Sequence, residues 1–137
     1  MRSRREFLKA GAIAAAGSFF IVPRHVLGKG FIAPSDKLNI AGIGVAGKGF
    51  SDVNNAFHNG ANNIVALCDV DWDLAKDQFA KHPKAKRYKD FREMLEKENL
   101  DVVFIVTNYD EKGHPRYPRL AIDCLRAGAH AGIEKPP

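Results

Sequence analysis

Three glycines, in the run Gly42-Ile-Gly44-Val-Ala-Gly47, have the spacing of a loop that cradles phosphate groups. The first glycine permits a tight turn, the second lets a pyrophosphate approach bare backbone, and the third lets a helix pack closely on a strand. A helix that begins after such a loop offers free N–H groups and the positive end of its dipole to phosphates. Glycines also make ordinary turns, so this spacing indicates a nucleotide site only together with a second feature.

Asp69 is that second feature, because it ends an apolar run 22 residues after Gly47. A carboxylate at this place hydrogen-bonds both hydroxyls of an adenine ribose. The alternative, a helix cap or a solvated loop end, is the better interpretation of Asp71 and Asp73. No Lys or Arg in residues 68–73 is available to receive a 2′-phosphate, which Asp69 would repel. The loop and the acid together predict a dinucleotide site that prefers NAD(H) over NADP(H).

Strand and helix signals alternate along the chain from Ser35 onward. We expect strands over residues 37–43, 63–69, 101–106 and 129–133. We expect helices over residues 50–59, from Asp71 to Pro83, from Asp90 through Glu98, and from Pro118 to Gly128. The residues expected to face inward from these helices are Val53, Ala56 and Phe57; Leu74, Ala75 and Phe79; Phe91, Met94 and Leu95; and Leu120, Ala121, Cys124 and Leu125. This alternation predicts an α/β fold built on a doubly wound parallel sheet.

The run Glu134-Lys135-Pro136, which follows a strand and the residues RAGAH, resembles a motif of the Gfo/Idh/MocA oxidoreductases. The runs CDVDWDLA and YKDFREML are similar to that family too, and the resemblance covers residues 37–136. It implies a Rossmann-type domain with a nicotinamide cofactor. It also implies that Lys135 lies beside the nicotinamide and the reacting carbon, and that Glu134 helps to hold the cofactor ribose. Thr107, at the end of a strand, is implied as a further cofactor-binding residue.

One stretch departs from the family pattern. In relatives, the strand that corresponds to residues 101–106 is followed by Thr-Pro and then by a His that begins the next helix. Here Thr107 is followed by Asn108-Tyr109 and the run DEKGHPRYP, and Tyr117 takes the place of the His. His114 lies in an insertion of about five residues, judged against usual loop lengths. Beside a proline in a charged loop, we interpret His114 as a solvated residue rather than an acid or base.

Residues 1–29 carry six Lys and Arg residues and one acid, and residues 10–22 within them carry no charge. The run SRREFLK and the neutral stretch from residue 10 to 22 resemble a twin-arginine export signal. We therefore expect a signal over residues 1–29, a linker over 30–36 and a dinucleotide-binding domain over 37–137. The Tat translocase is an expected partner, and the product is expected in the periplasm or tethered to the membrane by an uncleaved signal.

Charge and cysteine usage argue against a nucleic-acid-binding protein and against a metal or redox site. Residues 30–137 carry fifteen bases and fifteen acids, so a basic surface for nucleic acid is not expected. Cys68 lies in an apolar strand and Cys124 on an inward helix face, so both are interpreted as core thiols. The histidines share no ligand spacing, and we expect no metal site.

The family resemblance implies that further structure follows this motif and that a second α/β domain carries most of the substrate site. The sequence stops at Pro137, so we expect the doubly wound fold to be incomplete at its C-terminus. Three interpretations stay open: the cofactor domain of an oxidoreductase acting on a sugar, polyol or related compound; that of an NAD-dependent glycosidase of the same fold; or a non-catalytic nucleotide-binding remnant. A small-molecule substrate is expected only when a second domain completes the site.

We predict that export depends on Arg4 and Arg5 together, because the resemblance is to a pair of arginines and not to positive charge alone. Replacing both by Lys keeps the charge and should abolish delivery of a reporter protein fused after Gly28. Fractionation of cells into periplasm and cytoplasm measures this. Undiminished periplasmic arrival of the double variant would remove the twin-arginine interpretation.

Overall fold

The computed structural model describes residues 32–134 and divides the chain into two units, Met1–Pro34 and Ser35–Pro137. The expected export signal and Lys135 lie outside the described residues. In chain order the elements are η2 (Pro34–Asp36), β1 (Asn39–Ile43), α2 (Lys48–Phe57), η3 (His58–Gly60), β2 (Asn63–Cys68), α3 (Lys76–Lys81), β3 (Lys86–Tyr88), α4 (Phe91–Lys97), β4 (Val102–Ile105), α5 (Tyr117–Arg126) and β5 (His130–Ile133). None of the helices within residues 32–134 has the length and apolar character needed to cross a membrane.

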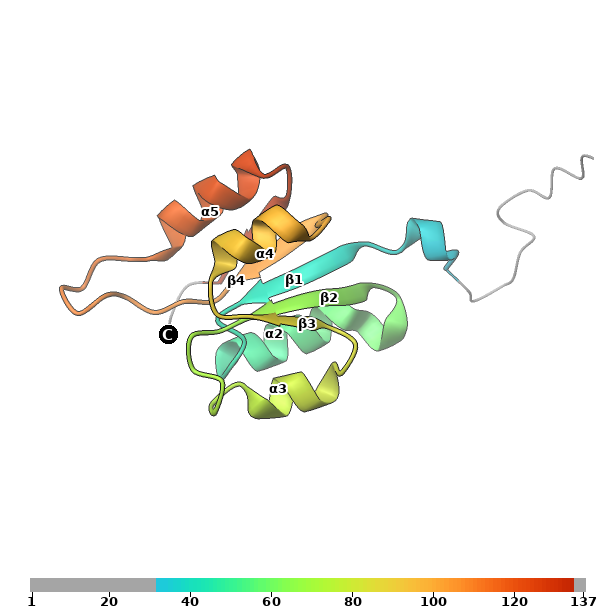
Figure 1. Cartoon of the computed structure of the whole chain (residues 1–137), viewed down its shortest axis with the longest axis horizontal. Helices are drawn as coiled ribbons and strands as arrows, with labels where there is room; N and C mark the ends of the chain where they lie inside the picture. Colours follow the sequence, from blue (N-terminus) through green and yellow to red (C-terminus); the bar gives the residue numbers. More distant parts are fainter. Residues whose placement is uncertain (1–31, 135–137) are drawn as a thin grey trace, which may run out of the picture. The chain divides into compact units, whose positions relative to one another are not determined.

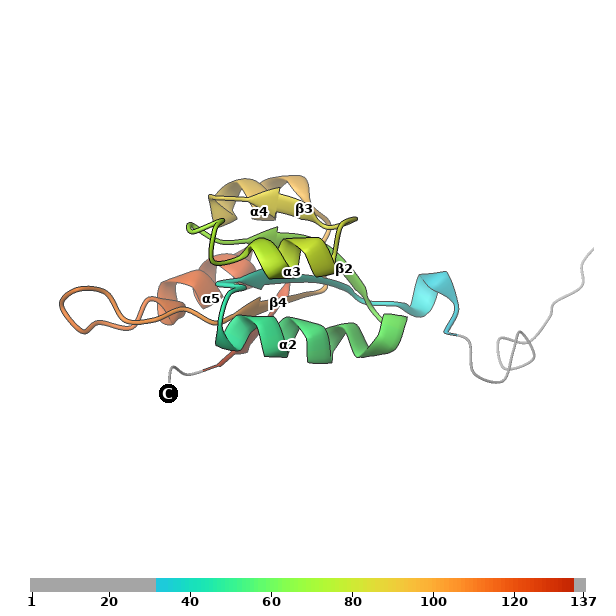
Figure 2. The same cartoon turned by 90° about the horizontal axis from the view of Figure 1, so that it is seen from below.

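The five strands form one parallel sheet in the order β3-β2-β1-β4-β5. Helices α2 and α3 cover one face of the sheet, and α4 and α5 cover the other (Figures 1 and 2). The doubly wound parallel sheet predicted from the sequence is therefore confirmed. The strand order reverses between β1 and β4, and in such sheets ligands bind at the carboxyl ends of the strands beside this point.

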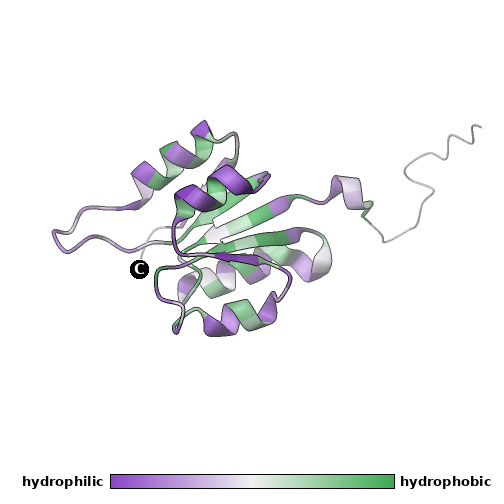
Figure 3. Cartoon of the chain, viewed as in Figure 1, coloured by the Kyte–Doolittle hydropathy of each residue, from purple (hydrophilic) through white to green (hydrophobic). Residues whose placement is uncertain are grey.

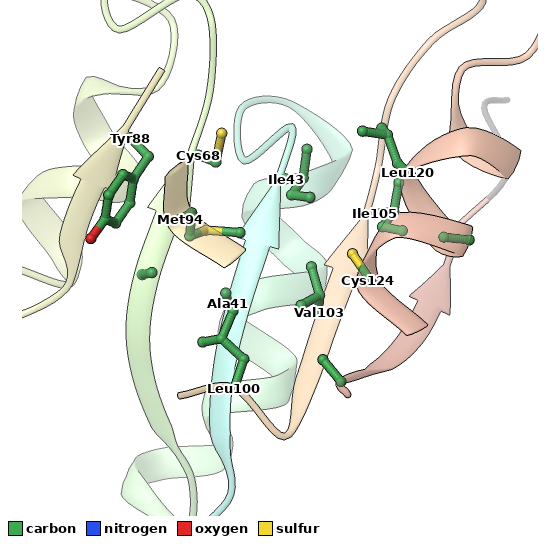
Figure 4. Packing of buried hydrophobic residues seen from close by; sticks show 13 residues of the cluster. Ala41, Ile43, Cys68, Tyr88, Met94, Leu100, Val103, Ile105, Leu120 and Cys124 are labelled. Carbon is green, nitrogen blue, oxygen red and sulfur yellow. The ribbon is translucent and has the colours of Figure 1, made fainter. Parts of the chain in front are cut away.

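A separate apolar core lies on each face of the sheet, and Figure 3 shows the hydrophobic strands between helices with polar outer surfaces. The core beneath α4 and α5 includes Ile43, Met94, Val103, Ile105 and Cys124, all buried (Figure 4). The core on the α2 and α3 face includes these buried residues: Ile40, Val45, Val53, Ile64, Leu67, Ala75, Phe79 and Ala85. Because the central strands are buried on both faces, their sequences are continuous apolar runs.

Helix α2 packs unusually closely on the loop that precedes it. A Cβ atom added to Gly49, in the first turn of α2, would overlap with the carbonyl oxygen of Gly44. A Cβ added to Gly47 would meet no atom within 4 Å. The close-packing role that the sequence pattern assigns to Gly47 therefore belongs to Gly49, two residues further along.

Two predicted core residues and one strand differ from the sequence prediction. Leu74 is 70% exposed, because it lies in a turn held by Asp71 and helix α3 starts only at Lys76. Leu125 is 59% exposed, because α5 covers β4 and β5 and the described sheet ends at β5. Strand β3 was not predicted, since its three residues pair only with β2 and two of them are charged and exposed.

Other helix signals agree with the structure. The side chain of Asp90 caps α4 by accepting a hydrogen bond of 2.9 Å from the amide of Arg92. Pro118 lies in the first turn of α5, and Gly128 follows that helix with a φ of 88°. Cys68 and Cys124 are buried free thiols, as predicted, and burial raises their pKa values to about 12 and about 11.

We predict that Gly49→Ala destabilises the domain by about 1–3 kcal/mol, the usual cost of forcing extra atoms into a packed site. In an ordinary helix interior the same change stabilises, because alanine is the better helix former by about 1 kcal/mol. Urea unfolding followed by circular dichroism measures the difference. Ser51→Ala, at an exposed position of the same helix, is the matched control. A stabilising Gly49→Ala would show that α2 does not rest on the loop as described.

Candidate functional site

A cleft of about 530 Å³ opens at the carboxyl ends of β1, β2 and β4, on the side of α4 and α5. The residues that line it are Ile43, Gly44, Cys68, Asp69, Val70, Lys89, Phe91, Arg92, Thr107, Asp110, Pro115, Arg116, Arg119, Leu120 and Asp123. The cleft thus lies at the reversal of strand order, where a doubly wound sheet binds its ligand. It brings together Gly44, Asp69 and Thr107, three of the site residues predicted from the sequence.

The glycine loop follows β1 and has the geometry that its sequence requires. Gly44 has a φ of 77°, and a Cβ there would overlap with the carbonyl oxygen of Val106, so only glycine fits. Its amide donates to the carbonyl of Cys68 at 2.9 Å. Gly47 precedes α2 and provides no side-chain cap, and the amides of Gly49 and Phe50 donate to the carbonyls of Ala46 and Gly47 at 3.1 Å each. The amides of Gly47 and Lys48 are therefore the ones left available to an anion. Gly42 is buried beneath the loop against Val45.

Asp69 connects the end of β2 to this loop. Its Oδ2 accepts hydrogen bonds from the amides of Val45 at 2.9 Å and Ala46 at 3.3 Å. Its Oδ1 accepts one from the amide of Asp71 at 3.0 Å. A carboxylate has about four acceptor positions, so one position on Oδ1 remains for a ribose hydroxyl in this arrangement. Asp69 therefore organises the phosphate loop, a role that the sequence spacing did not reveal.

Thr107, which lines the cleft, has an unsatisfied polar group. Its hydroxyl oxygen is buried and has no hydrogen-bond partner within residues 32–134. The strand end that carries it is fixed to β1, because the amide of Val106 donates to the carbonyl of Ile43 at 2.9 Å. A buried hydroxyl without a partner is costly, so it fits a place where a ligand supplies the missing bond.

Glu134 lies apart from the cleft that holds Asp69. Its amide donates to the carbonyl of Ile105 at 3.1 Å, and it lines a smaller cleft of about 250 Å³ with Asp52. Lys48 donates to Asp52 at 2.8 Å. This hydrogen bond and the charge of Asp52 raise the pKa of Lys48, and the charge of Glu134 acts in the same direction. The start of α2 and the end of β5 therefore share one electrostatic environment.

The connection from β4 to α5 projects beyond the sheet as a long loop (Figure 1). Asp110 holds it, because its carboxylate accepts from the amides of His114 at 2.8 Å and Lys112 at 2.9 Å. These bonds, led by that from His114, lower the pKa of Asp110. His114 is exposed, and its ring Nδ1 is 3.3 Å from Asp110. The interpretation of His114 as a solvated residue agrees with this geometry.

Sequence reasoning missed the cations of the cleft, namely Lys89, Arg92, Arg116 and Arg119. Lys89 directly follows β3, Arg92 lies in α4, Arg116 directly precedes α5 and Arg119 lies in α5, so no spacing relative to the glycine loop marks them. Cys68 also lines the cleft, but its raised pKa keeps it a thiol and not a thiolate at neutral pH. Within residues 32–134 there is no group of three or more His, Cys, Asp or Glu side chains that could hold a metal ion.

Comparison with known proteins agrees with this geometry. The profile of the Gfo/Idh/MocA family, described as the oxidoreductase family with an NAD-binding Rossmann fold, matches residues 37–137. The α-N-acetylgalactosaminidase of Shewanella oneidensis is 31% identical over 157 aligned residues, covering 97% of this chain. A glycosyl hydrolase family 109 protein of Shewanella sp. strain ANA-3 is 32% identical with the same coverage. The chain spans 33% of the length of each of these relatives.

Solved structures show the same fold. The myo-inositol 2-dehydrogenase from Lactobacillus plantarum aligns with a TM-score of 0.63 and 25% identity, covering 73% of this chain and 28% of the dehydrogenase. The WlbA dehydrogenase from Bordetella pertussis, solved with NADH and UDP-GlcNAcA, aligns with a TM-score of 0.62 and 22% identity. That alignment covers 72% of this chain and 28% of WlbA.

We predict that Asp69→Ala weakens NAD⁺ binding by roughly 10-fold or more, since a hydrogen bond to a charged group contributes about 1.5–3 kcal/mol. The variant also loses the carboxylate that holds Val45 and Ala46. Titration calorimetry with NAD⁺ measures the loss. Asp73→Ala, on the same turn and outside the cleft, removes the same charge and should change little. Unchanged affinity in Asp69→Ala would remove Asp69 from the site.

Proposed function

Because this chain belongs to the Gfo/Idh/MocA oxidoreductase family, we propose that it is the NAD-binding domain of an exported enzyme acting on a sugar or polyol. The bound cofactor would supply or accept a hydride. The observation that carries the proposal is the cleft at the strand reversal, where Gly44, Asp69 and Thr107 meet beside an uncapped helix start. The hydroxyl of Thr107 has no partner within residues 32–134, and the helix start has no side-chain cap.

Different residues of this chain would bind different parts of the cofactor. The amides at the start of α2 would bind the pyrophosphate, helped by the helix dipole. The remaining acceptor position of Asp69 would take a hydroxyl of the adenosine ribose, and the hydroxyl of Thr107 would gain its missing partner. Glu134, at the end of β5, would face the nicotinamide ribose. Lys135 follows it and would orient a substrate hydroxyl or share its proton; it lies outside the described residues.

A second candidate is a glycosidase that uses NAD without net turnover. The supporting observation is coverage: the glycosyl hydrolase family 109 relatives align with 97% of this chain, whereas the family profile begins at residue 37. Most of the first 36 residues therefore align with those relatives too. Export through a twin-arginine signal suits either candidate, because that route carries proteins that have already folded around a cofactor.

We predict that the 137-residue chain binds NAD⁺ and turns over no substrate. Correct positioning of the reacting carbon lowers the activation barrier by about 7–11 kcal/mol. Such positioning requires protein on the side of the substrate that faces away from the nicotinamide. The relatives are about three times as long as this chain, which leaves room for that protein in a second domain. Assays of NADH formation with a panel of sugars and polyols check this. Turnover that Lys135→Ala abolishes would show that the domain is sufficient alone.

Sequencing the gene past the Pro137 codon and assaying any longer product distinguish the dehydrogenase from the glycosidase. A dehydrogenase forms NADH in step with loss of the sugar. A glycosidase of this type releases the leaving group from an aryl N-acetylgalactosaminide without net NADH formation. A stop codon followed by unrelated sequence would instead support a nucleotide-binding remnant.

A further inference from the structure

A cleft of about 690 Å³ lies at the edge of the sheet opposite the dinucleotide cleft, the one that contains Asp69. It is lined by the first residues of β2 and β3 and by the last residues of α2 and α3, elements that can be followed in Figure 1. The strands are parallel, so their amino ends share this edge and their carboxyl ends share the other. A ligand in this cleft is therefore separated from a dinucleotide by the length of the strands.

Apolar side chains form part of the wall of this cleft. Phe57, at the end of α2, and Val65, in β2, are half-buried, so each keeps exposed surface for a ligand to cover. Ile64 and Ala85 line the cleft as well and are buried. The volume falls within the range of about 300–1,000 Å³ that is usual for small-molecule sites. The cleft therefore has room for the apolar body of a small organic molecule.

Hydrogen bonds hold the wall of this cleft in place. The ring Nε2 of His82, which follows α3, lies 2.8 Å from the Oδ1 of Asn54 in α2. The amide of Ala85 donates to the carbonyl of His82 at 3.0 Å, and the side chain of Asn62 donates to the carbonyl of Ala56 at 2.8 Å. A ligand that enters a preformed site has less conformational entropy to offset.

The same cleft carries an excess of positive charge. Within residues 32–134 it is lined by four lysines and one glutamate, a surplus of three positive charges. The glutamate is Glu98, whose carboxylate accepts hydrogen bonds from Lys86 at 2.8 Å and from the hydroxyl of Tyr88. The ammonium of Lys81 lies 5.2 Å from the centre of the Phe50 ring, a contact that leaves its charge intact. The acid of the cleft is therefore already paired, and three lysines keep their charge.

Two of these lysines, Lys37 and Lys84, form no hydrogen bond or ion pair in the described part of the chain. A lysine near the end of a helix can serve only to complement the negative end of the helix dipole. Lys81 is placed for that role, because it lies in the last turn of α3. Lys37 lies between η2 and β1 and Lys84 between α3 and β3, so neither belongs to a helix. Their donors and charge are therefore available to a ligand.

We propose that this cleft binds a small organic polyanion, whose apolar body contacts Phe57 and Val65 and whose charged groups contact Lys37 and Lys84. A lysine ammonium is a mobile point charge that binds phosphate and carboxylate alike. Multiple negative charge together with an apolar body, rather than one kind of anionic group, therefore defines the ligand. The site is independent of the proposed function, because none of its residues lines the dinucleotide cleft.

The test is a titration of the ¹⁵N-labelled 137-residue chain, followed by NMR. The probes are 1-naphthyl phosphate, naphthalene-1,4-dicarboxylate, inorganic phosphate and uncharged 1-naphthalenemethanol. At least one naphthyl anion should shift the backbone amides of Val65 and Lys86 and leave those of Gly44 and Asp69 in place. It should bind about 10-fold or more tightly than inorganic phosphate, because the ring buries apolar surface. It should exceed the uncharged alcohol by a similar factor, because the lysines contribute charge-assisted contacts.

Variants of the two unpaired lysines locate the site. Lys37→Ala combined with Lys84→Ala should lower the affinity for the naphthyl anion about 10-fold or more, because two charge-assisted contacts are lost. Lys37→Arg combined with Lys84→Arg keeps both charges and should retain binding. Lys76→Ala combined with Lys112→Ala is the matched control, since both lysines are exposed and line neither cleft. Circular dichroism verifies that each variant is folded.

Several results would overturn the proposal. Equal losses in the cleft variant and the control would do so, because net charge would then explain the effect. Shifts confined to the surroundings of Gly44 and Asp69 would place the anions in the dinucleotide cleft instead. A folded chain that binds no naphthyl anion, or that binds the uncharged alcohol equally well, would also contradict it. NAD⁺ affinity bears on the proposed function alone, so the two proposals fail separately.

Discussion

The carboxylate of Asp69 fastens the end of β2 to the glycine loop after β1, through the amides of Val45 and Ala46. The amide of Gly44 adds a bond in the same place to the carbonyl of Cys68. These contacts fix the loop at the point where the strand order reverses, and the first turn of α2 follows directly from it. A change in this junction would therefore move the glycine loop as a whole.

Close backbone contacts, together with the Asp69 carboxylate, shape the glycine loop. Gly44 and Gly49 let the loop, the end of β4 and the first turn of α2 approach one another at distances that a Cβ would prevent. Apart from Asp69, the side chains around the cleft make no hydrogen bond to the loop within residues 32–134. Thr107, Lys89 and Arg92 are such side chains, and all three line the cleft. The glycine pattern therefore reports the shape of the loop and not the side chains that surround it.

The sequence predicted the sheet, its helices and the loop-and-acid pair, because hydrophobic periodicity and glycine spacing report local geometry directly. It missed what depends on packing between distant segments. Leu74 was assigned to a buried face, but the turn made by Asp71 delays the start of α3 and shifts its phase. Strand β3 escaped prediction because a short, charged edge strand has no alternating pattern. Lys89 and Arg92 reach the cleft only because β3 pairs with β2.

The clefts that contain Asp69 and Glu134 lie on opposite faces of the sheet. Asp69 belongs to the cleft beside α4 and α5, whereas Glu134 belongs to the smaller one beside α2. A dinucleotide that contacts both residues must therefore cross the carboxyl edge of the sheet, and the start of α2 is the surface that it crosses. Lys48, the first residue of that helix, is bound to Asp52 and feels the charge of Glu134. The start of α2 is thus electrostatically coupled to the end of β5, the segment that precedes Lys135 in the sequence.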